Sequence, residues 1–409
     1  MEQQRIPRAL RRLRIGIATA GRFHVLDLAR ELHALGHQVR FYSYVPKRRA
    51  MRFGLPQECH VDLLPALAPY LMWEAAAPKT WAELRERLTW RALNRAVIER
   101  MEACDVFTCM SGIYLEAPLY AQETFGAKII LQRGSTHILS QDEILAEIPG
   151  AERPSRLAIA RELAGYSLAD RIAIPSQHVE KTFERDPASI VKTVRNPYGL
   201  DLTAFPRLRF RDRSETLTIV FAGTWCLRKG CDLLVEAVRR HRPIRLLHVG
   251  PIGDIHFPKG DPQIVHIPKV DQSALSSIFD RAHAFVLASR EDGLSLVLAQ
   301  ALASGLPVLC TSATGGADLR HTPALTDRIL VVRSGDLNAL IEGLQALRDR
   351  FSKGPEFASL ADDDRETLSW TAYARRFQAD LLSLFETANS DRALPPDAKS
   401  APIMPNGLH

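Results

Sequence analysis

The chain has 409 residues, a length beyond one ordinary hydrophobic core, so two or three domains are expected. Hydrophobic residues make up 46% and charged residues 24%, which is typical of globular enzymes, and no apolar run reaches the ~18 residues of a membrane-spanning helix. The net charge of +6 is unevenly distributed along the chain, because residues 1–52 contain twelve Lys and Arg residues and three acidic residues.

This basic N-terminal segment predicts either a solvated face or contact with an anionic membrane surface. Nucleic acid is not expected as a partner, because the basic clusters lack interleaved aromatic residues and no nucleic-acid-reading motif occurs. The six cysteines form no CxxC pair and lie at no zinc-ligand spacing, which indicates small buried side chains.

The chain opens with a strand, a helix and a second strand. Residues 13–20 are short and apolar, apolar positions within 27–36 trace one helical face that ends at Gly36, and residues 37–45 predict the second strand. Such a unit begins a doubly wound α/β domain. Further elements are expected in the same half: strands at 105–109, 128–132 and 171–175, and helices at 155–168 and 177–185.

Residues 195–213 change in character, with two prolines and many charges, and predict a linker between domains. Alternating strands and helices restart after it, so the predicted domains span 13–205 and 214–366. Residues 367–387 predict a terminal helix, and the four prolines of 388–409 predict a disordered tail.

Adjacent cations follow the first strand of the second domain. The strand ends at Gly223, Arg228 and Lys229 lie in the next loop, and a helix begins after Gly230. A helix N-terminus offers free N–H groups and a positive dipole end, and two cations beside it suit a diphosphate. A solvated turn would have the same composition, but the position at the carboxyl end of a strand favours the phosphate.

A second loop combines acids with the start of a helix. A strand ends at Ser289, acids stand at 291 and 292, and Gly293 precedes a helix. Asp292 and Gln300 are eight positions apart, slightly more than two helical turns, so both project from roughly one side. The N–H groups of residues 293 to 295 suit phosphate oxygens, and a carboxylate beside them suits sugar hydroxyls.

Both loops resemble motifs of the retaining family 4 glycosyltransferases, which have the GT-B architecture. The first reads G-T-W-C-L-R-K-G, where the family has G-x4-[RK]-K-G; the second reads D-G-L-S-L-V-L-A-Q-A-L-A-S-G-L-P-V, where the family has E-G-F-G-L-x-x-x-E-A-M-A-x-G-x-P-V. NPYGLD at 196–201 resembles a third family segment. The resemblance covers roughly residues 13–387 and implies an α/β fold: two Rossmann-like doubly wound domains facing across a cleft, with the terminal helix crossing back to the N-terminal domain.

The resemblance implies a role for each matching residue. Arg228 and Lys229 would bind the donor's diphosphate, and Asp292 would act on the transferred sugar. Asp292 and Gln300 stand where the family has glutamates, so an altered donor preference is expected. The implied donor-binding set, with Val270 at the nucleobase, is Gly223, Arg228, Lys229, Val270, Gly293, Leu294, Ser295 and Gln300.

Three loop positions of the N-terminal domain complete the predicted site. Gly21 and Arg22 would face the donor phosphate and the acceptor, and Arg133 would lie at the rim of the cleft. His137 is the predicted catalytic histidine near the transferred sugar, and His24 is the less favoured alternative.

The implied activity is transfer of a sugar, with retention, from a nucleotide-diphosphate sugar to a glycan or lipid-linked acceptor, in bacterial envelope or exopolysaccharide synthesis. A cytoplasmic enzyme, peripheral on the inner membrane face, is expected. No metal or cofactor is expected, since the D-x-D triplet at 362–364 lies in a polar run that suits a helix cap.

Two alternatives stay open: a nucleotide-sugar epimerase on the same fold, and a nucleotide-sugar-binding protein with weakened catalysis. A Rossmann oxidoreductase fits poorly, because G-x-G-x-x-G is missing after the first strand.

Overall fold

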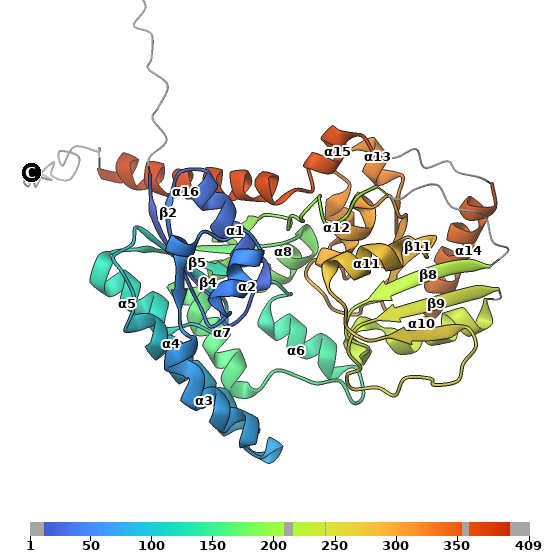
Figure 1. Cartoon of the computed structure of the whole chain (residues 1–409), viewed down its shortest axis with the longest axis horizontal. Coiled ribbons are helices and arrows are strands. Elements are labelled where there is room, and N and C mark those ends of the chain that lie inside the picture. The colour runs from blue at the N-terminus through green and yellow to red at the C-terminus, as the bar shows by residue number, and fades with distance from the viewer. Residues whose placement is uncertain (1–11, 208–215, 242, 354–359, 393–409) are drawn as a thin grey trace, which may run out of the picture.

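Two parallel β-sheets, one in each half of the chain, organise the structure (Figure 1). The computed structural model describes residues 12–207, 216–241, 243–353 and 360–392. Within them the first sheet has seven strands in the order β3-β2-β1-β4-β5-β6-β7, and the second has six in the order β10-β9-β8-β11-β12-β13. Two α/β domains with parallel sheets were predicted, and both are present.

The strands are short and apolar on both faces, as expected where helices cover both faces of a parallel sheet. Ile15 and Ile17 of the first sheet, and Ile219 and Phe221 of the second, are all buried. The strands of the first sheet are β1 (Arg14–Ala18), β2 (Gln38–Ser43), β3 (His60–Asp62), β4 (Val106–Met110), β5 (Lys128–Gln132), β6 (Arg171–Ile174) and β7 (Thr193–Arg195). Those of the second are β8 (Leu217–Ala222), β9 (Ile244–Val249), β10 (Ile264–Ile267), β11 (Ala284–Leu287), β12 (Val308–Thr311) and β13 (Ile329–Val332).

Helices connect these strands. In the N-terminal domain they are α1 (Phe23–Ala34), α2 (Lys47–Arg52), η1 (Gln57–Cys59), α3 (Leu64–Ala76), η2 (Lys79–Trp81), α4 (Ala82–Ile98), α5 (Glu116–Phe125), α6 (Ile138–Ala146), α7 (Arg156–Leu168), α8 (Gln177–Phe183) and α9 (Pro187–Ile190). In the C-terminal half they are η3 (Leu227–Lys229), α10 (Cys231–Arg240), α11 (Gln272–Phe279), α12 (Leu296–Ala303), η4 (Gly316–Leu319), α13 (Pro323–Thr326), α14 (Leu337–Lys353), α15 (Asp362–Glu366) and α16 (Trp370–Arg392).

Strand order determines where a ligand can bind. Chain order reverses on either side of β1 in the first sheet and on either side of β8 in the second. In doubly wound sheets a crevice forms at such a switch point, beyond the carboxyl ends of the strands. The loops after β1, β4, β8 and β11 are therefore where this fold places ligand contacts.

The last helix, α16, lies along the N-terminal domain (Figure 1). The Thr371 hydroxyl donates to Glu31 of α1 at 2.9 Å, and Gln378 Nε2 lies 3.0 Å from His37 Nε2. The helix extends to Arg392, a few residues beyond position 388, where the predicted tail begins. Residues 393–409 of that predicted tail lie outside the described part of the chain.

Candidate donor-binding and catalytic site

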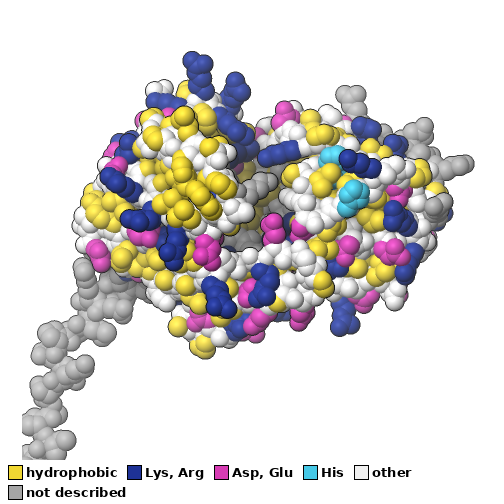
Figure 2. Space-filling model, turned by 90° about the horizontal axis from the view of Figure 1, so that it is seen from below, with side chains coloured by type: hydrophobic (Ala, Val, Ile, Leu, Met, Phe, Trp, Pro, Cys, Tyr) yellow, Lys and Arg dark blue, Asp and Glu magenta, His cyan; other side chains and the backbone are white. Residues whose placement is uncertain are grey.

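The two domains meet at the carboxyl edges of their sheets, where Figure 2 shows a hollow between two lobes. On the C-terminal side the loops after β8 and β11 border the contact. On the N-terminal side the border is formed by the segments after β5 and β6, residues 133–137 and 175–178.

Gly230 determines the position of the predicted cation loop. Its φ is +66°, and a Cβ atom there would lie 2.0 Å from the carbonyl oxygen of Ala288. Only glycine accepts both the left-handed backbone and this close approach. Arg290 N–H also donates to the Arg228 carbonyl at 2.9 Å. The loop is thereby held against the end of β11, beside the predicted acids.

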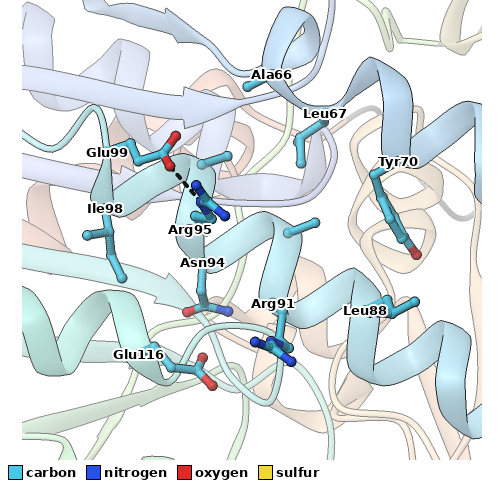
Figure 3. Close-up of a pocket in the computed structure, with 12 residues that line it drawn as sticks. Ala66, Leu67, Tyr70, Leu88, Arg91, Asn94, Arg95, Ile98, Glu99 and Glu116 are labelled. Atoms are coloured by element: carbon cyan, nitrogen blue, oxygen red, sulfur yellow. Dashed lines mark hydrogen bonds and ion pairs between the residues drawn. The ribbon is translucent and has the colours of Figure 1, made fainter.

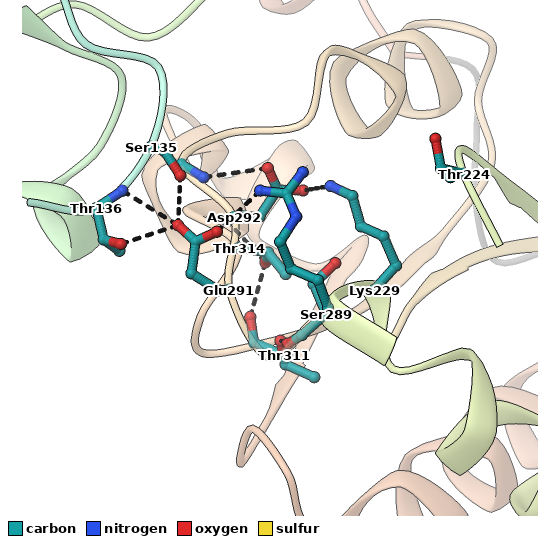
Figure 4. Close-up of polar contacts among 12 residues, drawn as sticks. Ser135, Thr136, Thr224, Lys229, Ser289, Glu291, Asp292, Thr311 and Thr314 are labelled. Atoms are coloured by element: carbon teal, nitrogen blue, oxygen red, sulfur yellow. Dashed lines mark hydrogen bonds and ion pairs between the residues drawn. The ribbon is translucent and has the colours of Figure 1, made fainter. Parts of the chain in front are cut away.

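Both predicted cations form ion pairs with the neighbouring acids (Figure 4). Arg228 Nη1 lies 2.8 Å from Glu291 Oε2, and Lys229 Nζ is paired with Asp292. The structure thus brings Arg228, Lys229 and Asp292 together, as the sequence motifs predict. The carboxylates balance the cations and hold them at the edge of the hollow.

Glu291 is a site residue that the sequence reasoning missed. Its side chain is fully buried, and one oxygen accepts hydrogen bonds from the Thr136 hydroxyl at 2.9 Å, the Thr136 N–H at 3.2 Å and the Ser135 hydroxyl. Gln141 Nε2 donates to the other oxygen at 3.3 Å. Glu291 therefore links Arg228 to the N-terminal domain (Figure 4).

The same contacts lower the pKa of Glu291. Burial raises it, but the charge of Arg228 and the hydrogen bonds from Ser135 and Thr136 outweigh burial and bring the pKa to about 2. The carboxylate is thus ionised at neutral pH. Only its position beside Asp292 could have indicated a role from the sequence.

Gly293 packs directly on the N-terminal domain. A Cβ atom at this position would lie 2.1 Å from the Gly134 carbonyl oxygen, and the Ser176 hydroxyl donates to the Gly293 carbonyl at 2.9 Å. A further contact joins the Gln177 N–H to Asp318 at 2.7 Å. The predicted phosphate-binding loop therefore lies at the domain contact itself.

We expect Gly293→Ala to push the two domains apart, because the added methyl group meets a backbone atom that cannot rotate away. The radius of gyration in solution scattering should rise, and stability should fall by about 1–3 kcal/mol. Gly260→Ala is the control for the radius only: a Cβ at Gly260 meets nothing within 4 Å, and its left-handed φ of +83° costs stability without separating the domains. An unchanged radius for Gly293→Ala would show that this close contact does not hold the domains together.

The remaining predicted donor-binding residues lie on the C-terminal domain. Gln300 is buried on α12, Leu294 is buried, and Ser295 is the residue that caps the start of α12. The Gly223 carbonyl lies 3.0 Å from His248 Nε2, and Val270 is half-buried just before α11. These positions follow the ends of β8, β10 and β11, along one edge of the second sheet.

His137 is placed in the domain core and not in the hollow. Its side chain is fully buried, its ring packs against Tyr166 and Phe183, and its Nδ1 accepts the Leu139 N–H at 3.3 Å. Burial lowers its pKa to about 4. The geometry therefore makes His137 the cap of α6, and the expectation of a histidine beside the transferred sugar is not met at this position.

Arg133 is also occupied by structural contacts. Its guanidinium donates to Glu162 at 2.6 Å and twice to the Thr136 carbonyl, at 2.9 and 2.6 Å. These bonds fold the 133–136 segment into the conformation that reaches Glu291. Arg133 thus holds the 133–136 segment in place, and it would contact a phosphate only if these hydrogen bonds were broken.

The first loop of the N-terminal domain is more open. Arg22 packs its guanidinium 3.5 Å from the centre of the Phe53 ring and pairs with Asp27 at 3.4 Å, beside Gly21. Phe23 has a φ of +36°, a strained value for a residue with a side chain, and 51% of it is exposed. An exposed aromatic side chain held in this way at the end of β1 suits contact with a ligand, and no sequence signal marked it.

Two further histidines follow strands of the first sheet, at its carboxyl edge. His24 is buried, lies 3.2 Å from Gln132 Oε1 and packs on Tyr198. His178, at the start of α8, follows Gln177, whose N–H binds Asp318 of the other domain. Burial lowers the pKa of His178, and the nearby charge of Glu291 opposes that shift. His178 was not predicted, although its position after β6 places it at the domain contact.

Among the described residues, no three His, Cys, Asp or Glu side chains are grouped as ligands of a metal ion. Over the same residues, no helix combines the length and apolar character needed to cross a bilayer.

The chain has the two-domain GT-B fold, and in structure it is similar to solved enzymes that include a glycosyltransferase from Rickettsia africae, with a TM-score of 0.60 at 14% identity over 93% of this chain and 99% of that one. The chain superposes on sucrose-phosphate synthase from Thermosynechococcus elongatus with a TM-score of 0.66, at 18% identity over 92% of this chain and all of that one. It superposes on HepE from Anabaena, in complex with UDP-glucose, with a TM-score of 0.61 at 13% identity, over 91% of this chain and 100% of that one. These likenesses confirm the predicted fold.

Sequence comparison points to a family. Residues 216–350 match the model of the glycosyl transferases group 1. The chain is also 24% identical over 195 residues to one component of the phosphatidylinositol N-acetylglucosaminyltransferase of Arabidopsis thaliana, and the match covers 44% of this chain and 42% of that protein. The predicted resemblance to group 1 glycosyltransferases is confirmed, and the match to their model lies within the C-terminal half of the chain.

Proposed function

We propose that the chain is a retaining glycosyltransferase that moves a hexosyl group from a nucleotide-diphosphate sugar to a glycan or lipid-linked acceptor. The observation that carries this proposal is the pairing of Arg228 with Glu291 and of Lys229 with Asp292 at the domain contact. Two cations and two carboxylates at the carboxyl edge of a doubly wound sheet match the charges of a diphosphate and the hydroxyls of a sugar.

Each residue has a proposed part in the reaction. The acceptor hydroxyl forms a bond to the anomeric carbon on the face from which the diphosphate leaves, and a diphosphate oxygen takes the acceptor's proton. When the donor binds, Lys229 pairs with the diphosphate in place of Asp292. The Asp292 carboxylate then accepts hydrogen bonds from sugar hydroxyls. Catalysis comes from positioning and from neutralising the charge of the leaving group.

The donor is proposed to be a UDP-sugar. This is supported by the similar HepE structures, which contain UDP-glucose, or UDP and glucose. Gln300 on α12 supplies an amide that hydrogen-bonds the ribose hydroxyls without a charge. An acceptor of the cell envelope is consistent with the basic N-terminal segment.

Product stereochemistry tests the proposal. The full chain is incubated with UDP-, GDP-, ADP- and dTDP-glucose together with lipid extracts or oligosaccharides, and the anomeric configuration of any product is read by proton NMR. We expect an α-linked product from the α-linked donor. A β-linked product would contradict retention.

Two other results would support the alternatives. Formation of a sugar epimer without any acceptor would indicate an epimerase. Tight binding of a UDP-sugar in calorimetry, with no transfer to any acceptor, would indicate a nucleotide-sugar-binding protein.

A further inference from the structure

Helices α3 and α4 form a hairpin that projects from the N-terminal domain (Figure 1). Helix α3, with the sequence LPALAPYLMWEAA, is almost entirely apolar, yet Leu67 is its one buried residue among the described positions. A helix that is apolar all round is normally enclosed by protein or lipid. Here six of the thirteen residues of α3 are exposed and six are half-buried.

The polarity of α3 is inverted. Its two polar side chains point inward: the Tyr70 hydroxyl pairs with Thr89 of α4, and Glu74 lies 4.0 Å from Arg85. Its outward positions Pro65, Pro69, Met72 and Ala76 are all exposed, Met72 by 75%. A helix whose outward side carries no polar group and whose polar side chains face its neighbour suits contact with an apolar medium.

Helix α4 adds positive charge beside this apolar face. Arg87, Arg91 and Arg95 recur at four-residue spacing on its exposed side, with exposed Leu84 and Trp81 at the tip of the hairpin. Arg95 pairs with Glu99, whereas Arg87 and Arg91 have no ion-pair partner within the described part of the chain. On this lobe Figure 2 shows a hydrophobic patch with Lys and Arg around it and fewer Asp and Glu.

An open pocket of about 880 Å³ lies between the two helices and the start of α5 (Figure 3). Leu67, Leu88 and Ala92 line it, and Arg91 stands at its side. Its two acids are both paired, Glu116 with Arg161 at 2.6 Å and Glu99 with Arg95 at 2.7 Å, which leaves Arg91 as the cation of its lining without an ion-pair partner among the described residues. The pocket therefore presents apolar walls and a cation, the two features of a site for an anionic lipid.

The hairpin is tied to the carboxyl edge of the first sheet. Asn94 of α4 accepts the N–H groups of Leu115 and Ala117 at 3.2 and 3.0 Å and donates to the Ile113 carbonyl at 3.0 Å. These residues form the loop after β4, at the carboxyl edge of the first sheet.

We propose that the α3–α4 hairpin docks on an anionic lipid bilayer, with α3 among the acyl chains and Arg87 and Arg91 on the phosphate groups. With 13 residues α3 is too short to span a bilayer, so it would lie in the interface, where tryptophan is favoured. A second copy of the chain fits less well, since a symmetric pairing would bring the arginine rows together. That this surface delivers a lipid-linked acceptor rests on the proposed function.

Vesicle flotation of the full chain tests the proposal without any donor. The vesicles contain phosphatidylcholine alone or phosphatidylcholine with an equal amount of phosphatidylglycerol. We expect binding to the anionic vesicles, and about 30-fold weaker binding for Arg87→Ser/Arg91→Ser, since each basic residue near an anionic surface contributes about a factor of five. Met72→Ser/Trp81→Ser should weaken binding at least about tenfold.

The chain offers matched controls. Arg245→Ser/Arg281→Ser removes exposed arginines of the C-terminal domain, and Val191→Ser changes a residue that is 77% exposed, close to Met72 at 75%. These variants should bind as the wild type does, and all variants should keep the wild-type Tm. Equal binding by hairpin and control variants, or no vesicle binding at all, would overturn the proposal.

Self-association is read in the same samples by analytical ultracentrifugation. A dimer that Met72→Ser/Trp81→Ser dissociates, without vesicle binding by the wild type, would assign the surface to a second copy and overturn the proposal. Because flotation needs no sugar transfer, vesicle binding without transferase activity would refute the proposed function alone, and activity on a water-soluble acceptor without vesicle binding would refute only the docking surface.

Discussion

Lys229→Ala is expected to lower kcat/KM for sugar transfer by about 10²–10³-fold, because it removes a preorganised cation from the place where the leaving diphosphate gains charge. The loss should fall mainly on kcat, since that charge is greatest in the transition state. Lys229→Arg, which keeps the charge, should retain more activity. The measurement is steady-state kinetics with the donor found in the substrate panel.

Stability must be followed in the same variants. Lys229→Ala leaves the buried carboxylate of Asp292 without its partner, so a loss of Tm is expected together with the loss of activity. Arg245→Ala, at an exposed position on β9, is the control and should change neither quantity. If Lys229→Ala kept the wild-type kcat/KM, Lys229 would not bind the diphosphate as proposed.

Glu291→Gln is expected to weaken the contact between the domains and to remove a pH-dependent part of the stability. The pKa of Glu291 is lowered from 4.5 to about 2 in the folded protein, so the carboxylate binds fewer protons when folded than when unfolded. The stabilisation, about 3 kcal/mol by linkage, is therefore complete above about pH 4.5 and is lost as the pH falls toward 2. Glutamine has the same shape as glutamate but carries no charge, so it cannot neutralise Arg228.

Urea unfolding between pH 7 and pH 2 measures this term. The wild type should be more stable than Glu291→Gln at pH 7, and the difference should shrink as the pH drops below about 4.5. Glu99→Gln is the control, because Glu99 forms an exposed pair with Arg95, and such pairs contribute little. A difference between wild type and Glu291→Gln that stays constant with pH would show that Glu291 acts through its shape and not its charge.

Much of the fold follows from local pattern. Short apolar runs such as 128–132 and 217–222 became strands, because a parallel sheet covered on both faces needs apolar side chains on both sides of each strand. The donor-side motif was recognisable for a similar reason: Gly223, Arg228 and Lys229 are close in sequence, so one loop places them together. The hairpin of α3 and α4 was not predicted, because an apolar run without alternation resembles a core segment as much as an exposed helix.

What the sequence by itself determined is thus the short-range part of this protein: two series of α/β elements, and the placement of the cations Arg228 and Lys229 just after a strand. Tertiary structure alone decided which side chains meet across the cleft. Glu291 reaches Thr136 over 155 positions, and His137, four residues after Arg133, turns into an aromatic core instead of the hollow. The physical reason is that spacing along a helix or strand indicates which residues share a face, whereas what covers that face depends on packing between elements far apart in the chain.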